Sequence, residues 1–102
     1  MKYTLDKDGN PVFEPDLIKW AKWIESEKRT VANETVGDSK ISTVFLGIDH
    51  AFDGGPPVLW ETMVFGGELD QHQERCGGSQ PQAQKMHNRM VQMVKDGYKN
   101  NP

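Results

Sequence analysis

Two apolar runs rich in β-branched and aromatic residues most constrain what this chain can fold into. They cover residues 40–50 (KISTVFLGIDH) and 57–67 (PVLWETMVFGG), and a short connection containing Gly54 and Gly55 joins them. β-branched and aromatic residues favour strands, and a glycine-bearing connection allows two strands to pair as an antiparallel hairpin. We therefore expect this hairpin to form the centre of a small sheet.

The flanking segments predict two helices and one further strand. After Pro15, which suits a first helical position, an apolar stripe at helical spacing predicts a helix to about Lys28. A second stripe over residues 83–94 predicts a helix that ends at Gly97, and residues 30–36 predict a strand. The expected fold class is α+β, with a small antiparallel sheet of three or four strands and two helices packed on it.

The chain length predicts a single domain. A chain of 102 residues is enough for one modest core, so we expect residues 1–102 to form one unit. Within it, residues 1–13 predict an N-terminal arm or a short hairpin, because a turn composition separates two short apolar segments. Residues 97–102 predict a flexible tail.

The pairing of the two central strands determines which residues reach the core. If Ile48 lies opposite Val58, both faces of the sheet are largely apolar, unlike those of an antiparallel sheet with one solvated side. One face then carries Val44, Leu46, Trp60 and Thr62, and the other carries Thr43, Phe45, Glu61, Met63 and Phe65. The helices cover one face, so the second requires the N-terminal arm or another subunit. A homodimer is the simplest arrangement.

Charge and composition exclude several classes of function. The formal net charge is −3 and the mean hydropathy is −0.72. Because no apolar run approaches the roughly 18 residues that span a bilayer, and the first residues lack the apolar segment of a secretion signal, neither a membrane partner nor export is expected. Lys28-Arg29 is the only adjacent basic pair, so no nucleic-acid partner is expected. The single cysteine, Cys76, suits a reducing cytoplasm.

Five segments of the sequence form a pattern: residues 41–50 (ISTVFLGIDH), 54–57 (GGPP), 60–67 (WETMVFGG), Glu74-Arg75 and the helix from Ala83 to His87. This pattern resembles that of a family of small, uncharacterised phage and prophage proteins. The resemblance covers about residues 20–94 and implies a phage context and action in the host cytoplasm. It implies no established activity. Where the family commonly has an aromatic or Tyr-Ser/Thr segment, this chain has CGGS at residues 76–79, which predicts a looser last connection.

Asp49 and His50 are candidates for function because they end a predicted strand at a loop. Functional groups often lie at such positions. The alternative is that Asp49 caps the following turn, through Asp53 and Gly54, and that His50 is merely exposed or hydrogen-bonded.

Glu61 is a candidate because it lies within an apolar strand. Burial raises the pKa of a carboxyl group unless a cation pairs with it. The alternative is a salt bridge to Arg75 or Arg89, or an edge charge that discourages aggregation.

The histidines and the cysteine supply ligand atoms of the kind that hold metals. However, His72-x3-Cys76 is a weak spacing and the sequence has no CxxC or HExxH motif, so no metal or cofactor is assigned. His87 lies on the apolar stripe of the last helix, where a lone histidine is usually a hydrogen-bonded core residue. A small-molecule or metal site, acting as a ligand sponge or a hydrolase-like centre, remains an alternative that requires convergence of Asp49, His50, Glu61 and His87.

Protein binding is the function that the residue types favour most. Trp23 flanks the first helical stripe, and Met86, Met90 and Met93 lie on the last helix. Such residues anchor interfaces, although simple core packing is the alternative for each. Without a nucleophile–base pair, catalysis is not expected. We expect a non-catalytic phage accessory protein that binds a host protein or itself, for example to counter a host defence. The candidate contact residues are Trp23, Asp49, His50, Glu61, Arg75, His87 and Met90.

Overall fold

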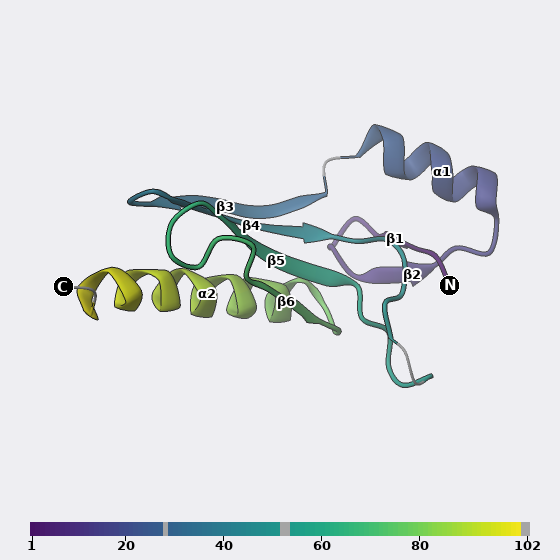
Figure 1. Ribbon diagram of the computed structural model, residues 1–102. Helices are drawn as coiled ribbons and strands as arrows, with labels where there is room; N and C mark the ends of the chain where they lie inside the picture. Colours follow the sequence, from purple (N-terminus) through teal and green to yellow (C-terminus); the bar gives the residue numbers. More distant parts are fainter. Residues whose placement is uncertain (28, 52–53, 101–102) are drawn as a thin grey trace.

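A computed structural model describes residues 1–27, 29–51 and 54–100 of the chain, and it has an α+β fold, as predicted. The four-stranded antiparallel sheet has the order β3-β4-β5-β6, and β1 and β2 form a separate two-stranded hairpin (Figure 1). The elements are β1 (Tyr3–Leu5), β2 (Pro11–Phe13), α1 (Leu17–Ser26), β3 (Thr30–Val36), β4 (Ser39–Phe45), β5 (Trp60–Phe65), β6 (Gln73–Cys76) and α2 (Gln80–Asn100).

The two helices are attached to the fold in different ways. α2 lies along one face of the sheet and contacts all four of its strands. α1 stands beside the N-terminal hairpin and contacts β1. The indole Nε1 of Trp20 anchors α1, because it lies 3.1 Å from the carbonyl oxygen of Tyr3 and 3.0 Å from that of Gly47. Asp16 caps the start of α1 by accepting hydrogen bonds from the amides of Ile18 and Lys19.

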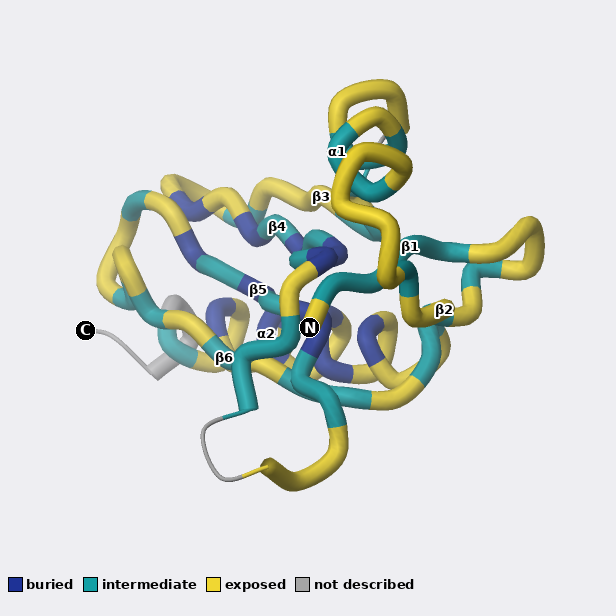
Figure 2. Tube along the Cα trace, turned by 90° about the vertical axis from the view of Figure 1, so that its right-hand side faces the viewer, coloured by how far each residue is buried: buried dark blue, intermediate teal, exposed yellow. Residues whose placement is uncertain are grey.

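The core lies between the sheet and α2, where Figure 2 shows the buried residues. The apolar stripe of α2 recurs every three or four residues, so that it faces the sheet along the whole helix. The buried apolar residues form two clusters, one of Ile41, Val64, Met90, Val91 and Val94, the other of Phe45, Leu59, Trp60, Ala83 and Met86.

The predicted register of the two central strands was wrong by one residue. Phe45 pairs with Trp60 and Thr43 with Thr62, whereas the assumed pairing of Ile48 with Val58 places Leu46 opposite Trp60. Gly47 explains the difference: its φ of +77° belongs to the left-handed region, and the ladder does not continue through it. A one-residue slip moves every side chain to the other face.

The observed register gives the sheet one apolar face and one mixed face. Thr43, Phe45, Trp60, Thr62 and Val64 are buried. The opposite face carries both polar and apolar side chains; these residues are Asn33, Thr35, Lys40, Ser42, Val44, Glu61, Met63, Phe65, Gln73 and Arg75. The expectation of two apolar faces, on which the predicted homodimer rested, is therefore not met.

Two further features were not predicted. β6 forms within residues 66–78, a polar connection whose structure the sequence left uncertain. The pattern Gln-Glu-Arg-Cys of this strand carries no apolar alternation that would predict it. α2 continues through Gly97 to Asn100, so the helix is longer than predicted. Of the two alternatives for residues 1–13, the structure has the short hairpin: Tyr3 pairs with Phe13, and Asp6 accepts hydrogen bonds from the amides of Asp8 and Asn10 in its turn.

Candidate functional site

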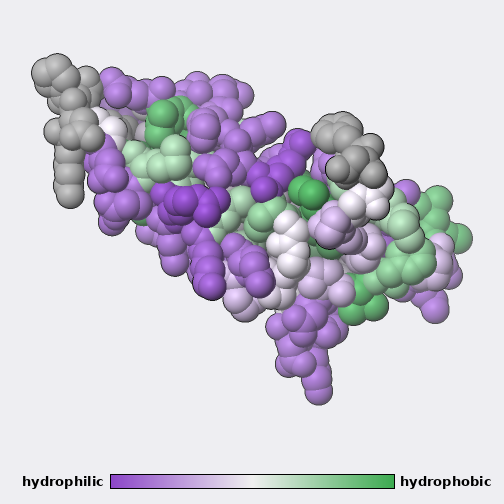
Figure 3. Space-filling model, turned by 90° about the horizontal axis from the view of Figure 1, so that it is seen from below, coloured by the Kyte–Doolittle hydropathy of each residue, from purple (hydrophilic) through white to green (hydrophobic). Residues whose placement is uncertain are grey.

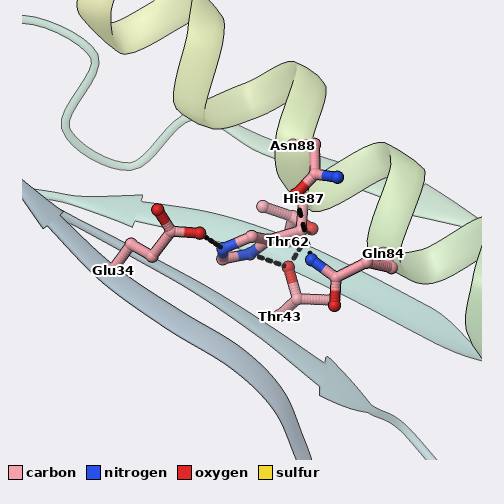
Figure 4. A network of polar contacts seen from close by, with 6 residues as sticks. All are labelled: Glu34, Thr43, Thr62, Gln84, His87 and Asn88. Carbon is pink, nitrogen blue, oxygen red and sulfur yellow. Dashed lines mark hydrogen bonds and ion pairs between the residues drawn. The ribbon is translucent and has the colours of Figure 1, made fainter.

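His87 is the centre of a buried polar network that joins α2 to β3, β4 and β5 (Figure 4). Its position on the α2 stripe aims the ring at the sheet, and none of the residue is exposed. Nδ1 lies 2.7 Å from Oγ1 of Thr43, and Nε2 lies 2.9 Å from Oε1 of Glu34. The hydroxyl groups of Thr43 and Thr62 are 2.5 Å apart. The prediction of a hydrogen-bonded core histidine is confirmed.

The network can satisfy His87 in either protonation state. The Glu34 carboxylate only accepts, so Nε2–H donates to it. When the ring is neutral, Nδ1 accepts from the Thr43 hydroxyl, which in turn accepts from Thr62. When the ring is charged, Nδ1–H donates to Thr43, and Thr43 then donates to Thr62. The two hydroxyl groups reverse their direction, and no hydrogen bond is lost.

The order hydroxyl, imidazole, carboxylate resembles that of a nucleophile, a base and an orienting acid. A nucleophile must reach its substrate, however, and Thr43 is fully buried beneath α2. The Thr43 oxygen is also within hydrogen-bond distance of both Thr62 and His87. In this conformation the network therefore supports the packing of α2 on the sheet, not acyl transfer.

Glu61 forms an ion pair with Arg75, as one of the sequence alternatives predicted. Arg75 lies opposite Glu61 in the ladder of β5 and β6, and its Nε is 2.8 Å from Oε2 of Glu61. Successive strand residues point to opposite faces, so Glu61 and Thr62 are on different sides of the sheet. The sheet therefore separates Glu61 from His87.

Asp49 closes the connection between β4 and β5. Its Oδ1 accepts hydrogen bonds from the amides of Ala51, at 2.8 Å, and Val58, at 2.9 Å. The bond from Val58, followed by that from Ala51, lowers the pKa of Asp49. The role of Asp49 as a turn cap is thus confirmed, while its predicted continuation to Asp53 lies outside the described residues. His50 is half-buried and donates its amide to the Val58 carbonyl.

The lowered pKa of Asp49 predicts a pH dependence of stability. Because the folded pKa is below the ordinary value of 3.8, the contribution to stability is present above that value and is lost as the pH falls through the folded pKa. We expect Asp49→Asn to lower the melting temperature at pH 7, with a smaller deficit relative to the wild type below pH 4. Thermal unfolding followed by circular dichroism from pH 7 to pH 2.5 measures this, and a deficit that is constant with pH would contradict it.

The four residues of the predicted small-molecule or metal site do not form one site. Glu61 and His87 lie on opposite faces of the sheet, and Asp49 and His50 lie in the loop after β4. Within residues 1–27, 29–51 and 54–100, no group of three or more His, Cys, Asp or Glu side chains is placed to hold a metal ion. Burial raises the pKa of the Cys76 thiol, which disfavours the reactive thiolate.

Two predicted contact residues prove to be parts of the interior. Trp23 is half-buried, and its ring meets that of Phe45 edge to face, with centroids 5.8 Å apart. It attaches α1 to the core and is not a free interface anchor. Met90 is fully buried and Met86 nearly so, because the α2 stripe packs on the sheet; Met93 alone of the three is exposed. For Trp23, Met86 and Met90 the core-packing alternative is therefore correct.

An exposed apolar surface lies at the N-terminal end of the molecule, where the sequence did not predict one. We call this surface the apolar end and define it by Met1, Phe13, Leu17, Ile18 and Ile48. Met1, Phe13 and Leu17 line a shallow hollow of about 330 Å³, and Ile48 bridges to Lys2. Figure 3 shows apolar surface at this end of the molecule, with smaller apolar areas elsewhere along it.

The apolar end was missed because Leu17 belongs to the predicted inner stripe of α1. Leu17 is in fact 60% exposed and Ile18 68% exposed, and α1 has no buried residue. Amphipathic spacing gives the direction of a helix face but not how much of that face another element covers.

No family model, no curated protein and no solved structure matches this chain. The function of the protein is therefore argued from the geometry of its structure. Neither described helix is long and apolar enough to cross a membrane.

Proposed function

We propose that this chain is a non-catalytic binding protein whose contact surface is the apolar end. One observation carries the proposal. Among the described residues, eight large apolar side chains are exposed, and five of them, Met1, Phe13, Leu17, Ile18 and Ile48, belong to this one surface. Single exposed apolar residues are ordinary on a protein surface, whereas a cluster of them marks a site of interaction.

The contacts beneath the apolar end support its use as a binding surface. Phe13 rests on Tyr3 edge to face, with ring centroids 5.9 Å apart, and Trp20 ties the start of α1 to Tyr3 and Gly47. The exposed side chains of the apolar end thus project from a backbone that hydrogen bonds and ring packing hold in place. A surface that is already ordered loses less conformational entropy when a partner binds.

The biological setting is proposed from the sequence resemblance alone. It points to a phage accessory protein acting in the cytoplasm of its host, with a host protein or a second copy as the partner. Counteraction of a host defence is one role that a small binding protein of this kind would serve.

The proposal predicts that polar substitutions at the apolar end reduce binding. We expect Phe13→Ser and Ile18→Ser baits to capture at least tenfold less protein than the wild type, because each removes apolar area from the contact. Tagged protein is offered untagged copies of itself and, separately, a bacterial lysate, and the captured proteins are quantified by mass spectrometry. Phe65→Ser is the matched control, since Phe65 is 44% exposed on the open sheet face and Phe13 is 46% exposed.

Circular dichroism establishes that each bait is folded. Captures that do not differ among the wild type, both apolar-end variants and the control would reject the proposed function. So would a loss of binding in Phe65→Ser equal to that in Phe13→Ser, because the contact would then not be specific to this surface.

A further inference from the structure

We propose that the partner of the apolar end is a second copy of this chain, joined across a two-fold axis that passes between the two copies of Leu17 and Ile18. This inference rests on the proposed function and names its partner. In such a dimer the two α1 helices run antiparallel, and the same surface is used by both copies.

The chain exposes more surface than a compact domain of its size, enough for an interface with a second copy. Its accessible surface is 6448 Å², whereas a compact monomer of 11.6 kDa exposes about 5,800 Å². Its radius of gyration is 14.9 Å, against about 13 Å for a compact domain of this length. The excess of about 600 Å² approaches the roughly 800 Å² that each partner contributes to a standard interface.

α1 is the element that a partner would cover. It stands at the outside of the molecule in Figures 1 and 2. Its first turn contains Leu17 and Ile18, and none of its ten residues is buried. A helix with an apolar side gains most of its stability from packing that side against another surface, and the chain itself covers only the side carrying Trp20 and Trp23.

The charges around Leu17 and Ile18 favour a second copy over an unrelated partner. Acidic Glu14 and Asp16 precede the apolar pair, and basic Lys19 and Lys22 follow it. Lys22 is one helical turn beyond Ile18 and on the same side of α1, so under a two-fold rotation about the apolar pair Lys22 of each copy approaches Glu14 of the other. The positive charge after the apolar pair in one copy thus meets the negative charge before it in the other, as an interface between identical copies requires.

The groups involved are available for these contacts. Neither lysine side chain takes part in an ion pair within the described part of the chain. Glu14 uses Oε1 to accept from the Asp16 amide, and a carboxylate accepts further hydrogen bonds at its other oxygen.

Charge reversal tests the arrangement. Lys22→Glu and Glu14→Lys each place like charges at two symmetric contacts, so we expect each variant to raise the dimer dissociation constant about tenfold or more in sedimentation equilibrium. An equimolar mixture of the two variants restores opposite charges at both contacts, so we expect a heterodimer of near wild-type affinity. Lys40→Glu, on the open sheet face, is the control for net charge. Ile18→Asp removes the apolar centre and should give a monomer.

Each outcome decides the inference. Restoration of affinity in the mixture supports it. A wild-type monomer at every concentration, a dimer that survives Ile18→Asp, or a dimer insensitive to both charge reversals overturns it. If the wild type is monomeric and the capture of a bacterial protein still depends on Phe13 and Ile18, only the dimer is rejected and the proposed function stands.

Discussion

Replacing His87 with alanine is expected to lower the free energy of unfolding by about 3–5 kcal/mol. The variant leaves a cavity beneath α2, which accounts for about 2 kcal/mol or more. It also removes the buried hydrogen bond from His87 to Thr43 Oγ1, which keeps only Thr62 as a partner, and a lost buried hydrogen bond costs about 1 kcal/mol or more; Glu34, whose side chain is 48% exposed, is solvated by water instead. Urea denaturation followed by circular dichroism measures the loss.

His72→Ala is the matched control for His87→Ala. His72 lies outside the core, 3.7 Å from Oε2 of Glu74 with 40% of its side chain exposed, so its removal should cost less than about 1 kcal/mol. Equal effects of the two alanine variants would show that the buried network contributes nothing beyond an ordinary surface contact. His87→Gln, which retains polar atoms in the core, should lie between His87→Ala and the wild type.

Phe45→Ala is expected to cost about 3–5 kcal/mol, the range for a large aromatic residue removed from a core. Phe45 is fully buried and joins two elements, because its ring lies 5.8 Å from Trp23 of α1 and 4.9 Å from Trp60 of β5. The same variant should therefore loosen α1, and the tryptophan fluorescence of the folded state should shift toward that of exposed indole.

Phe65→Ala is the control, because it makes the same substitution on the solvated face of the sheet. It should cost less than about 1 kcal/mol. If Phe45→Ala does not fold, Phe45→Leu provides the measurement, with an expected loss of about 1.5 kcal/mol. A loss for Phe45→Leu no greater than that for Phe65→Ala would contradict the assignment of Phe45 to the core.

Most elements of the fold could be predicted from the sequence, whereas the two faces of the sheet could not. Strand 30–36 was placed correctly, and the stripe from Ala83 to Val94 gave the buried side of α2, because helical periodicity is strong over several turns. The register of β4 and β5 was extrapolated through Gly47, whose positive φ interrupts the ladder. β6 had no apolar alternation to reveal it.

The candidate chemistry was predictable where the local sequence determines it. The turn-capping role of Asp49 follows from residues nearby in the chain. The partners of Glu61 and His87 lie 14 and 53 residues away, so they depend on strand pairing and on helix docking. Arg75 was among the predicted alternatives for Glu61, but the link from His87 to Glu34 required the position of the edge strand. The exposure of Leu17 and Ile18 depended on how α1 docks.

The pair of threonines beneath His87, Thr43 and Thr62, has a consequence for how the chain selects the native register of β4 and β5 over slipped registers. A slip of β4 by one residue along β5 would bring Val44 opposite Thr62 and under α2, where it offers His87 no hydrogen bond. The side chain of Thr43 would then move to the solvated face. The same slip would turn Ile41 and Phe45 to the solvated face and bring Ser42 under α2. The unpartnered imidazole adds to that loss of apolar packing, so the network further penalises a mispaired sheet during folding and widens the energy gap between the native ladder and its nearest competitor.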